Sequence, residues 1–168
     1  MKKIIALVLT ALMLLTCSFA LAESELPFEG SQLSFEDYGF AITLPDDWNV
    51  MEVPQEAADA GFFFITTSPD GARTLQLQYS DLDEAVEGID AVVEKLSAAY
   101  EDVAAVQING IDFAAFTLAE QDINALVCTG GSGTGLYCFY FTPASDEAFG
   151  PIAQAIAGSI MPLEDAAE

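Results

Sequence analysis

Cys128 and Cys138 are the residues whose type and spacing most directly suggest chemistry. They lie in two apolar runs, 123–128 and 136–142, that a glycine-rich segment separates. If these runs form a hairpin centred near Gly133, the two cysteines stand opposite each other with Cα atoms about 4.5 Å apart, which suits a disulfide. We expect this bridge to form and to stabilise the domain by roughly 2–3 kcal/mol. Two buried free thiols are the alternative.

The segment between the two runs contains the pattern Gly131-x-Gly133-x-Gly135, which resembles a phosphate-binding loop. A phosphate cradle needs a helix N-terminus after the glycines and often a lysine. A predicted strand follows these glycines, and no lysine is near them. The pattern therefore predicts a hairpin loop.

Four carboxylates gather before a predicted helix and could hold calcium: Asp81, Asp83, Glu84 and Glu87. Their spacing fails the EF-hand pattern, because Val86 takes the place of the glycine and Val92 that of the last ligand. Helix capping and the helix dipole account for the acids more simply. We identify no metal-binding residue.

Asp46 and Asp47 precede Trp48, a combination that could form a sugar platform with acid catalysis. Adjacent carboxylates on a turn point in different directions, however, and a lone tryptophan in a small domain is more often a core residue. The chain also contains no histidine, which removes Ser-His-Asp and Cys-His mechanisms and the usual zinc and copper ligands. We identify no catalytic and no cofactor-binding residue.

The first 22 residues have the pattern of a secretory signal peptide. Lys2 and Lys3 form a positive start, residues 4–15 are almost wholly apolar, and Ala20-Leu21-Ala22 places small residues where a signal peptidase cleaves. We expect cleavage after Ala22 and a secreted or otherwise extracytoplasmic protein.

Lipidation is the alternative fate of this N-terminus. Leu14-Leu15-Thr16-Cys17 lies where a lipoprotein signal would, although Thr16 is a poor fit before the cysteine. In that case the protein would be anchored to the membrane through Cys17.

The composition of the mature chain limits its partners. Loss of residues 1–22 leaves 146 residues, in which Arg73 and Lys95 face 27 carboxylates, a formal charge of −25. Such a charge repels nucleic acid and anionic membrane surfaces and attracts cations weakly. We therefore expect neither nucleic acid nor an anionic membrane surface as a partner, and we identify no cofactor.

The alternation of apolar residues predicts a single α+β domain over residues 35–162. We expect a lead-in over 23–34 that is flexible, an acidic tail over 163–168, and strands, a helix, strands and a terminal helix in that order. The strands are predicted at 40–44, 48–53, 62–67, 74–79, 103–108, 111–118, 123–128 and 136–142, and the helices over about 83–100 and after Ser145. The long apolar runs require helices on both faces of an antiparallel sheet.

Three segments resemble the PsbP-like superfamily. They are Tyr38–Trp48, which ends a strand in Pro and Trp, Asn109-Gly110-Ile111, and Phe139–Pro143 followed by a terminal helix. The resemblance covers roughly residues 33–162 and implies an antiparallel sheet sandwiched between helices. It also implies a role in binding other proteins, as in the family's photosystem II subunit, Ran-binding protein and exported lipoproteins. It transfers no catalytic residue.

Two functions remain open from the sequence. The first is an exported, non-enzymatic interaction module of the cell envelope or secretome that binds a protein partner. The second is a carboxylate-based hydrolase or a cation-dependent enzyme. A deep pocket with converging carboxylates would favour the enzyme, and a flat acidic surface would favour the module.

The signal sequence leads to a direct prediction about processing. Because Ala20-Leu21-Ala22 fits a cleavage site better than Leu14–Cys17 fits a lipoprotein signal, the mature chain should begin at Glu23 and carry no lipid. Intact mass spectrometry of the exported protein tests this. A diacylglyceryl group on Cys17 would contradict it.

Overall fold

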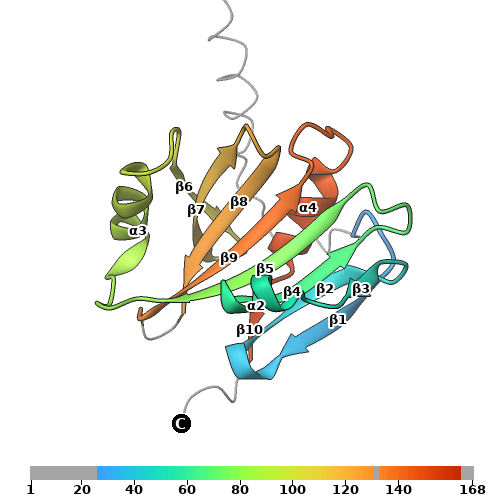
Figure 1. Ribbon diagram of the computed structural model, residues 1–168, viewed down its shortest axis with the longest axis horizontal. Helices are drawn as coiled ribbons and strands as arrows, with labels where there is room; N and C mark the ends of the chain where they lie inside the picture. The colour runs from blue at the N-terminus through green and yellow to red at the C-terminus, as the bar shows by residue number, and fades with distance from the viewer. Residues whose placement is uncertain (1–25, 131–132, 164–168) are drawn as a thin grey trace, which may run out of the picture.

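The computed structural model describes residues 26–130 and 133–163, which build two antiparallel sheets and three α-helices (Figure 1). One sheet has seven strands in the order β3-β4-β5-β9-β8-β7-β6, and the other has three in the order β1-β2-β10. The predicted α+β class is therefore confirmed. The expected Cys17 and Ala22 signals lie outside the described residues.

The seven-stranded sheet is built largely from hairpins that the sequence pattern predicts. Its strands are β3 (Asn49–Met51), β4 (Phe62–Thr67), β5 (Thr74–Asp81), β6 (Ala104–Ile108), β7 (Ile111–Leu118), β8 (Ile123–Thr129) and β9 (Gly135–Thr142). The turn at Asn109-Gly110 joins β6 to β7, and both residues have positive φ, as the two-residue hairpin turn requires. The non-local step is the pairing of β5 with β9, which joins the two halves of the sheet.

The three-stranded sheet contains β1 (Gly30–Phe35), β2 (Phe40–Pro45) and β10 (Met161–Pro162). The expectation of a flexible lead-in was wrong for residues 30–34, because Gly30–Phe35 pairs with β2 along its full length. The sequence pattern did not reveal β1, because this strand is largely exposed and carries several small or polar residues, whereas β2 is mostly buried. Near the C-terminus, Pro162 lies in the short strand β10 and pairs with Phe40 of β2.

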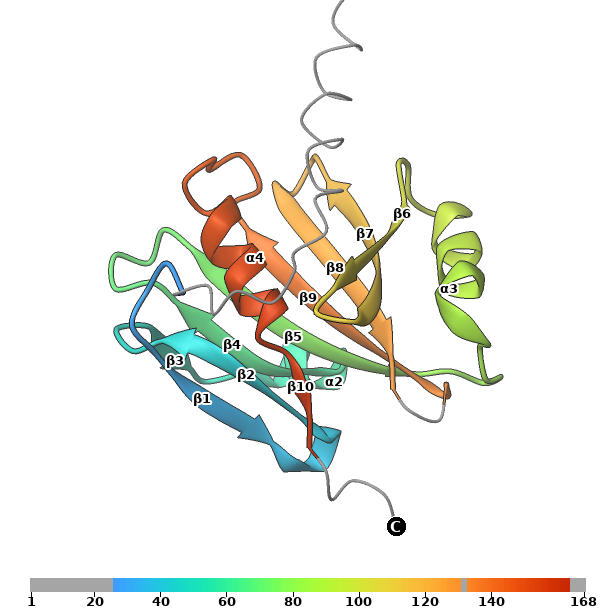
Figure 2. The ribbon, with the colours of Figure 1, turned by 180° about the vertical axis from the view of Figure 1, so that it is seen from behind.

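The helices α3 (Gly88–Ser97) and α4 (Gly150–Gly158) pack on opposite faces of the large sheet. Val92 of α3 packs with Phe116 of β7 and Val127 of β8. Ile156 of α4 packs with Phe113 of β7 in the other cluster, which also includes β2. Figure 2 shows α4 beside β2 and β10, and α3 beyond β6. A short third helix, α2 (Gln55–Asp59), lies against β4.

Both long helices begin later than the sequence pattern predicts. The helix expected from about residue 83 begins at Gly88, whose φ of 79° is left-handed and cannot continue an α-helix. Leu82 and Val86 still pack on the α3 face, but their amides donate to the β8–β9 loop. The expected capping role of the acids at 81–87 was therefore wrong. The terminal helix, expected after Ser145, begins at Gly150, and Ser145 bonds to Asp122.

Aromatic rings join the two sheets. Tyr38 stacks on Phe63 with ring centroids 3.8 Å apart, and Phe40 meets Phe139 of β9 edge-on at 5.8 Å. The hydroxyl of Tyr137 donates to the carbonyl of Tyr38 at 3.0 Å. These contacts hold the small sheet over the same face of the large sheet that α4 covers.

Gly61 allows a test of how α2 is held against β4 and β5. Its φ is 90°, its carbonyl accepts a hydrogen bond from the amide of Tyr79, and a Cβ there would overlap the backbone oxygen of Tyr79. Gly61→Ala should lower the free energy of unfolding by at least about 2 kcal/mol, because strain and overlap add. Urea unfolding measures the change.

Gly71→Ala is the matched control. Gly71 also has a positive φ of 70°, but a Cβ there meets nothing within 4 Å, so only the conformational cost of roughly 1 kcal/mol should appear. Equal losses in the two variants would contradict the close approach at Gly61.

Candidate functional site

A cleft of about 320 Å³ is the best-defined concave feature of the described residues that more than one segment of the chain lines. It lies between the β2–β3 turn and the β4–β5 turn, with α4 and the segment before β1 completing it. The lining residues are Phe28, Pro45, Asp47, Trp48, Ser68, Pro69, Asp70, Arg73 and Ile152. Asp47 and Trp48 are conspicuous in the sequence, but no sequence pattern connects them with the other lining residues.

Trp48 forms an aromatic wall of this cleft. It is half-buried, packs against the main core, and its ring centroid lies 5.9 Å from that of Phe149. The expected core role therefore describes only part of this side chain, since another part lines the cleft. Trp48 is also the single tryptophan of the chain.

Asp46 and Asp47 point in different directions, as expected for neighbours on a turn. The carboxylate of Asp46 accepts a hydrogen bond from the hydroxyl of Ser31 on β1 at 2.6 Å. Asp47 lines the cleft instead. The two adjacent acids therefore do not form a catalytic pair, and only one of them faces the site.

The β4–β5 turn is held by its own side chains. The Ser68 hydroxyl donates to Asp70 at 2.6 Å, and the amide of Ala72 donates to the same carboxylate oxygen at 3.0 Å. The amide of Arg73 donates to the Ser68 hydroxyl at 3.0 Å. The hydrogen bond from Ser68 is the main reason that the pKa of Asp70 lies below its ordinary value. Asp70 is therefore a fixed and ionised carboxylate on the rim of the cleft.

Arg73 ties this turn to the segment before α4. Its Nε donates to the carboxylate of Asp146 at 2.8 Å, and its guanidinium lies 5.7 Å from the ring centroid of Phe149. The hydrogen bond from Arg73 is the main cause that lowers the pKa of Asp146. The cation that lines the cleft is therefore already neutralised by a carboxylate.

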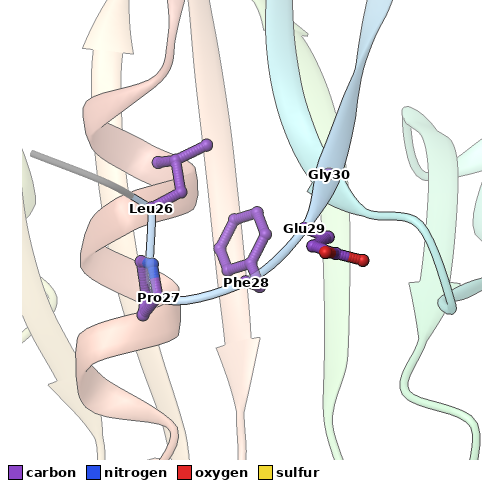
Figure 3. Close-up of a pocket in the computed structure, with 5 residues that line it drawn as sticks. All are labelled: Leu26, Pro27, Phe28, Glu29 and Gly30. Atoms are coloured by element: carbon purple, nitrogen blue, oxygen red, sulfur yellow. The ribbon is translucent and has the colours of Figure 1, made fainter. Parts of the chain in front are cut away.

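Figure 3 shows the second concave feature, which is open and lies at the N-terminal end of the described chain. Its volume is about 590 Å³, and consecutive residues Leu26–Gly30 line it. Only Phe28 of these packs against the core. One short stretch of chain cannot bring groups together from several directions, so we assign no site to this hollow.

The cysteines do not form the expected disulfide. Both thiols are free and buried, and the register pairs Cys138 with Val127 and Cys128 with Tyr137. The expected register was wrong by one residue, and since side chains alternate along a strand, the two thiols lie on opposite faces. Cys128 belongs to the core beneath α4 and Cys138 to the core beneath α3. The alternative of two buried thiols is the one that the structure shows.

The glycine-rich loop contacts protein rather than presenting an anion site. The carbonyl of Gly133 accepts from the amide of Val86 at 2.9 Å, and that of Thr134 accepts from the amide of Leu82 at 2.8 Å. The loop thus joins the β8–β9 hairpin to the segment before α3. Its residues 131–132 lie outside the described part of the chain.

The carboxylates at 81–87 do not gather into a metal site. No group of three or more Cys, Asp or Glu within residues 26–130 and 133–163 is arranged to hold a metal ion. Asp81 accepts a hydrogen bond from the hydroxyl of Tyr79 at 2.9 Å. In the same described residues, no helix is long and apolar enough to span a bilayer.

Comparison with solved structures supports the fold that the resemblance implied. The solution structure of cyanobacterial PsbP (CyanoP) from Synechocystis sp. PCC 6803 is similar, with a TM-score of 0.58 and 15% identity, over 85% of this chain and 97% of that one. A crystal structure from Bacteroides thetaiotaomicron VPI-5482 is similar with a TM-score of 0.54 and 16% identity, over 81% of this chain. The match covers 49% of that second chain, so this protein spans about half its length.

No protein family and no curated protein matches the sequence itself. The two structural matches show that the chain has a PsbP-like fold. At sequence identities of 15% and 16% they establish the fold alone.

The two thiols should behave as inert core groups. Burial raises the pKa of Cys128 to about 12 and that of Cys138 to about 11, so both are protonated at neutral pH and hidden from reagents. Ellman's reagent should react slowly with the native mature chain and promptly with two thiols after denaturation.

A reducing agent should leave the melting temperature unchanged, because no bridge exists to be broken. A drop in melting temperature on reduction, with no reactive thiols in the unreduced denatured chain, would show that Cys128 and Cys138 form a disulfide.

Proposed function

We propose that this protein is an extracytoplasmic, non-enzymatic interaction module that binds a protein partner along the edge of its large sheet. The observation that carries the proposal is that β3 lies at the edge of the sheet with exposed apolar side chains. This strand ends the seven-stranded sheet, and its Val50 and Met51 side chains are 65% and 49% exposed. An edge strand offers unpaired backbone groups to another chain, and its exposed apolar side chains add contact area.

The acidic residues around β3 indicate which kind of partner segment could bind there. Exposed Asp46 and Asp47 precede the strand and exposed Glu52 follows it, within a mature chain of formal charge −25. A basic or neutral extended segment with apolar side chains complements this edge, whereas nucleic acid and anionic lipid surfaces are repelled. The signal sequence supports secretion, with lipid attachment at Cys17 as the alternative, and with either fate this edge would lie outside the cytoplasm.

The second candidate function is a carboxylate-based hydrolase, because Asp47 and Asp70 line the same cleft. A glycosidase needs one carboxyl group with a raised pKa to act as the acid. The pKa of Asp70 is shifted downward, because Ser68 and Ala72 donate hydrogen bonds to its charged form. The shift has the wrong direction for a general acid, so Asp70 could fill only the role of the ionised carboxylate, and the exposed β3 edge is the observation that favours binding.

Photocrosslinking in the cells that export the protein tests the proposal. A photoreactive phenylalanine analogue at position 50 should give one discrete adduct with another protein, because the partner lies against β3. The same probe at exposed Glu94 of α3 is the control, since that helix packs on β6, β7 and β8. The position-50 adduct should weaken in a Met51→Lys background, which keeps the strand but adds charge to the edge.

Identical adducts from both positions, or an adduct that Met51→Lys leaves unchanged, would contradict the edge-binding function. Hydrolysis of an ester, peptide or glycoside by the purified chain that Asp47→Asn abolishes would favour the enzyme instead.

A further inference from the structure

The cleft beside β3 has an unbalanced charge. Of its charged lining groups, Arg73 is paired with Asp146 at 2.8 Å, and this is the one ion pair among the described residues. Within the described residues no ion pair joins a cation to Asp47 or Asp70, although Arg73 contributes to the lowered pKa of Asp70. The other side-chain cation of the mature chain, Lys95, lies on α3 at the opposite face of the sheet. The charged groups that line the cleft are therefore two carboxylates and one arginine that is already paired with Asp146.

The walls of the cleft suit a flat cation on an apolar stem. Trp48 supplies an indole, which is the best aromatic partner for a cation. Pro45, Pro69 and Ile152 supply apolar surface for an aliphatic stem. A volume of about 320 Å³ lies at the small end of ligand sites, which fits one long side chain rather than a large cofactor.

The neighbouring Arg73 shows the same chemistry within the chain. Its guanidinium lies 5.7 Å from the ring of Phe149 while its Nε pairs with the Asp146 carboxylate. An aromatic ring and a carboxylate thus hold a guanidinium in the wall of the cleft. Trp48 and Asp47 line the same cleft, so an indole and an exposed carboxylate are both within it for a second guanidinium.

We propose that this cleft receives an arginine side chain of the partner protein, with its guanidinium against Trp48 and its charge met by Asp47. Arginine is preferred to lysine because its planar, weakly hydrated guanidinium both stacks on an aromatic face and pairs with a carboxylate. The inference rests on the proposed function, since it places a second contact beside the β3 edge. The partner segment would pair with β3 and insert this arginine at the Asp47 end of the strand.

Trp48 gives the experiment its reporter, because the fluorescence of the single tryptophan reads only this cleft. The probe is an acetylated and amidated pentapeptide with a central arginine between alanines, titrated into the full mature chain. The arginine peptide should change the fluorescence in a saturable way, the lysine peptide should bind more weakly, and a glutamine peptide should give no saturable change.

Asp47→Asn and Asp46→Asn form a matched pair of variants. Each removes one exposed carboxylate from the same turn, but only Asp47 lines the cleft, whereas Asp46 bonds to Ser31. Asp47→Asn should weaken binding of the arginine peptide by about fivefold, the effect of losing one exposed charged contact. Asp46→Asn should leave it within about twofold. Circular dichroism confirms that both variants are folded.

Equal weakening by the two variants would overturn the proposal, because it would mean that the general negative field attracts the peptide. The absence of a saturable response, or equal binding of the lysine and arginine peptides, would overturn it as well. None of these outcomes affects the position-50 crosslink, so failure of the arginine site and failure of the edge-binding function are distinguishable.

Discussion

The fold depends on the burial of β9 on both of its faces. Phe139 and Phe141 are 1% and 2% exposed on the side that α4 and the small sheet cover, while Cys138 and Leu136 are buried on the side of α3. Each large apolar side chain removed from water contributes about 1.5–3 kcal/mol. A strand with two apolar faces requires a cover on each, and the chain supplies both covers from segments distant in sequence.

The same central strand explains why the cysteines cannot meet. A strand repeats its side-chain direction every two residues, so the relation between two facing residues changes completely when the register moves by one. Here Val127, not Cys128, faces Cys138. The hairpin thus assigns one thiol to each core, where burial raises both pKa values and keeps the sulfur atoms unreactive. The cysteines act as small apolar side chains.

The cleft shows how this scaffold assembles chemistry from separate elements. Its residues come from before β1, from the β2–β3 turn, from the β4–β5 turn and from α4. The ion pair between Arg73 and Asp146 spans 73 residues of sequence and connects the β4–β5 turn to the segment before α4. Because the turn at Ser68 is fixed by its own hydrogen bonds, Asp70 is held ionised on one rim while Trp48 forms another wall. The β3 edge and this cleft are neighbours because Trp48 directly precedes the strand.

Local sequence patterns determined much of this protein. Alternation predicted the strands of the β4–β5 and β6–β7 pairs and the β8–β9 hairpin, because such pairs form between neighbours in the sequence. The absence of histidine and the charge of −23 for the whole chain also follow from composition alone. Residues 30–34 were mistaken for a lead-in, because an exposed strand lacks apolar alternation and is defined only by its partner β2.

Tertiary structure decided everything that depends on distant neighbours. Because Gly88 is left-handed and Leu82 and Val86 bond to the β8–β9 loop, α3 begins later than the helix predicted over about 83–100. The register of one hairpin decided the state of the cysteines, and packing between four segments decided that Asp47 lines the same cleft as Trp48 and Arg73 while Asp46 bonds to Ser31. Periodicity reports which residues are buried, but only long-range packing decides which side chains meet.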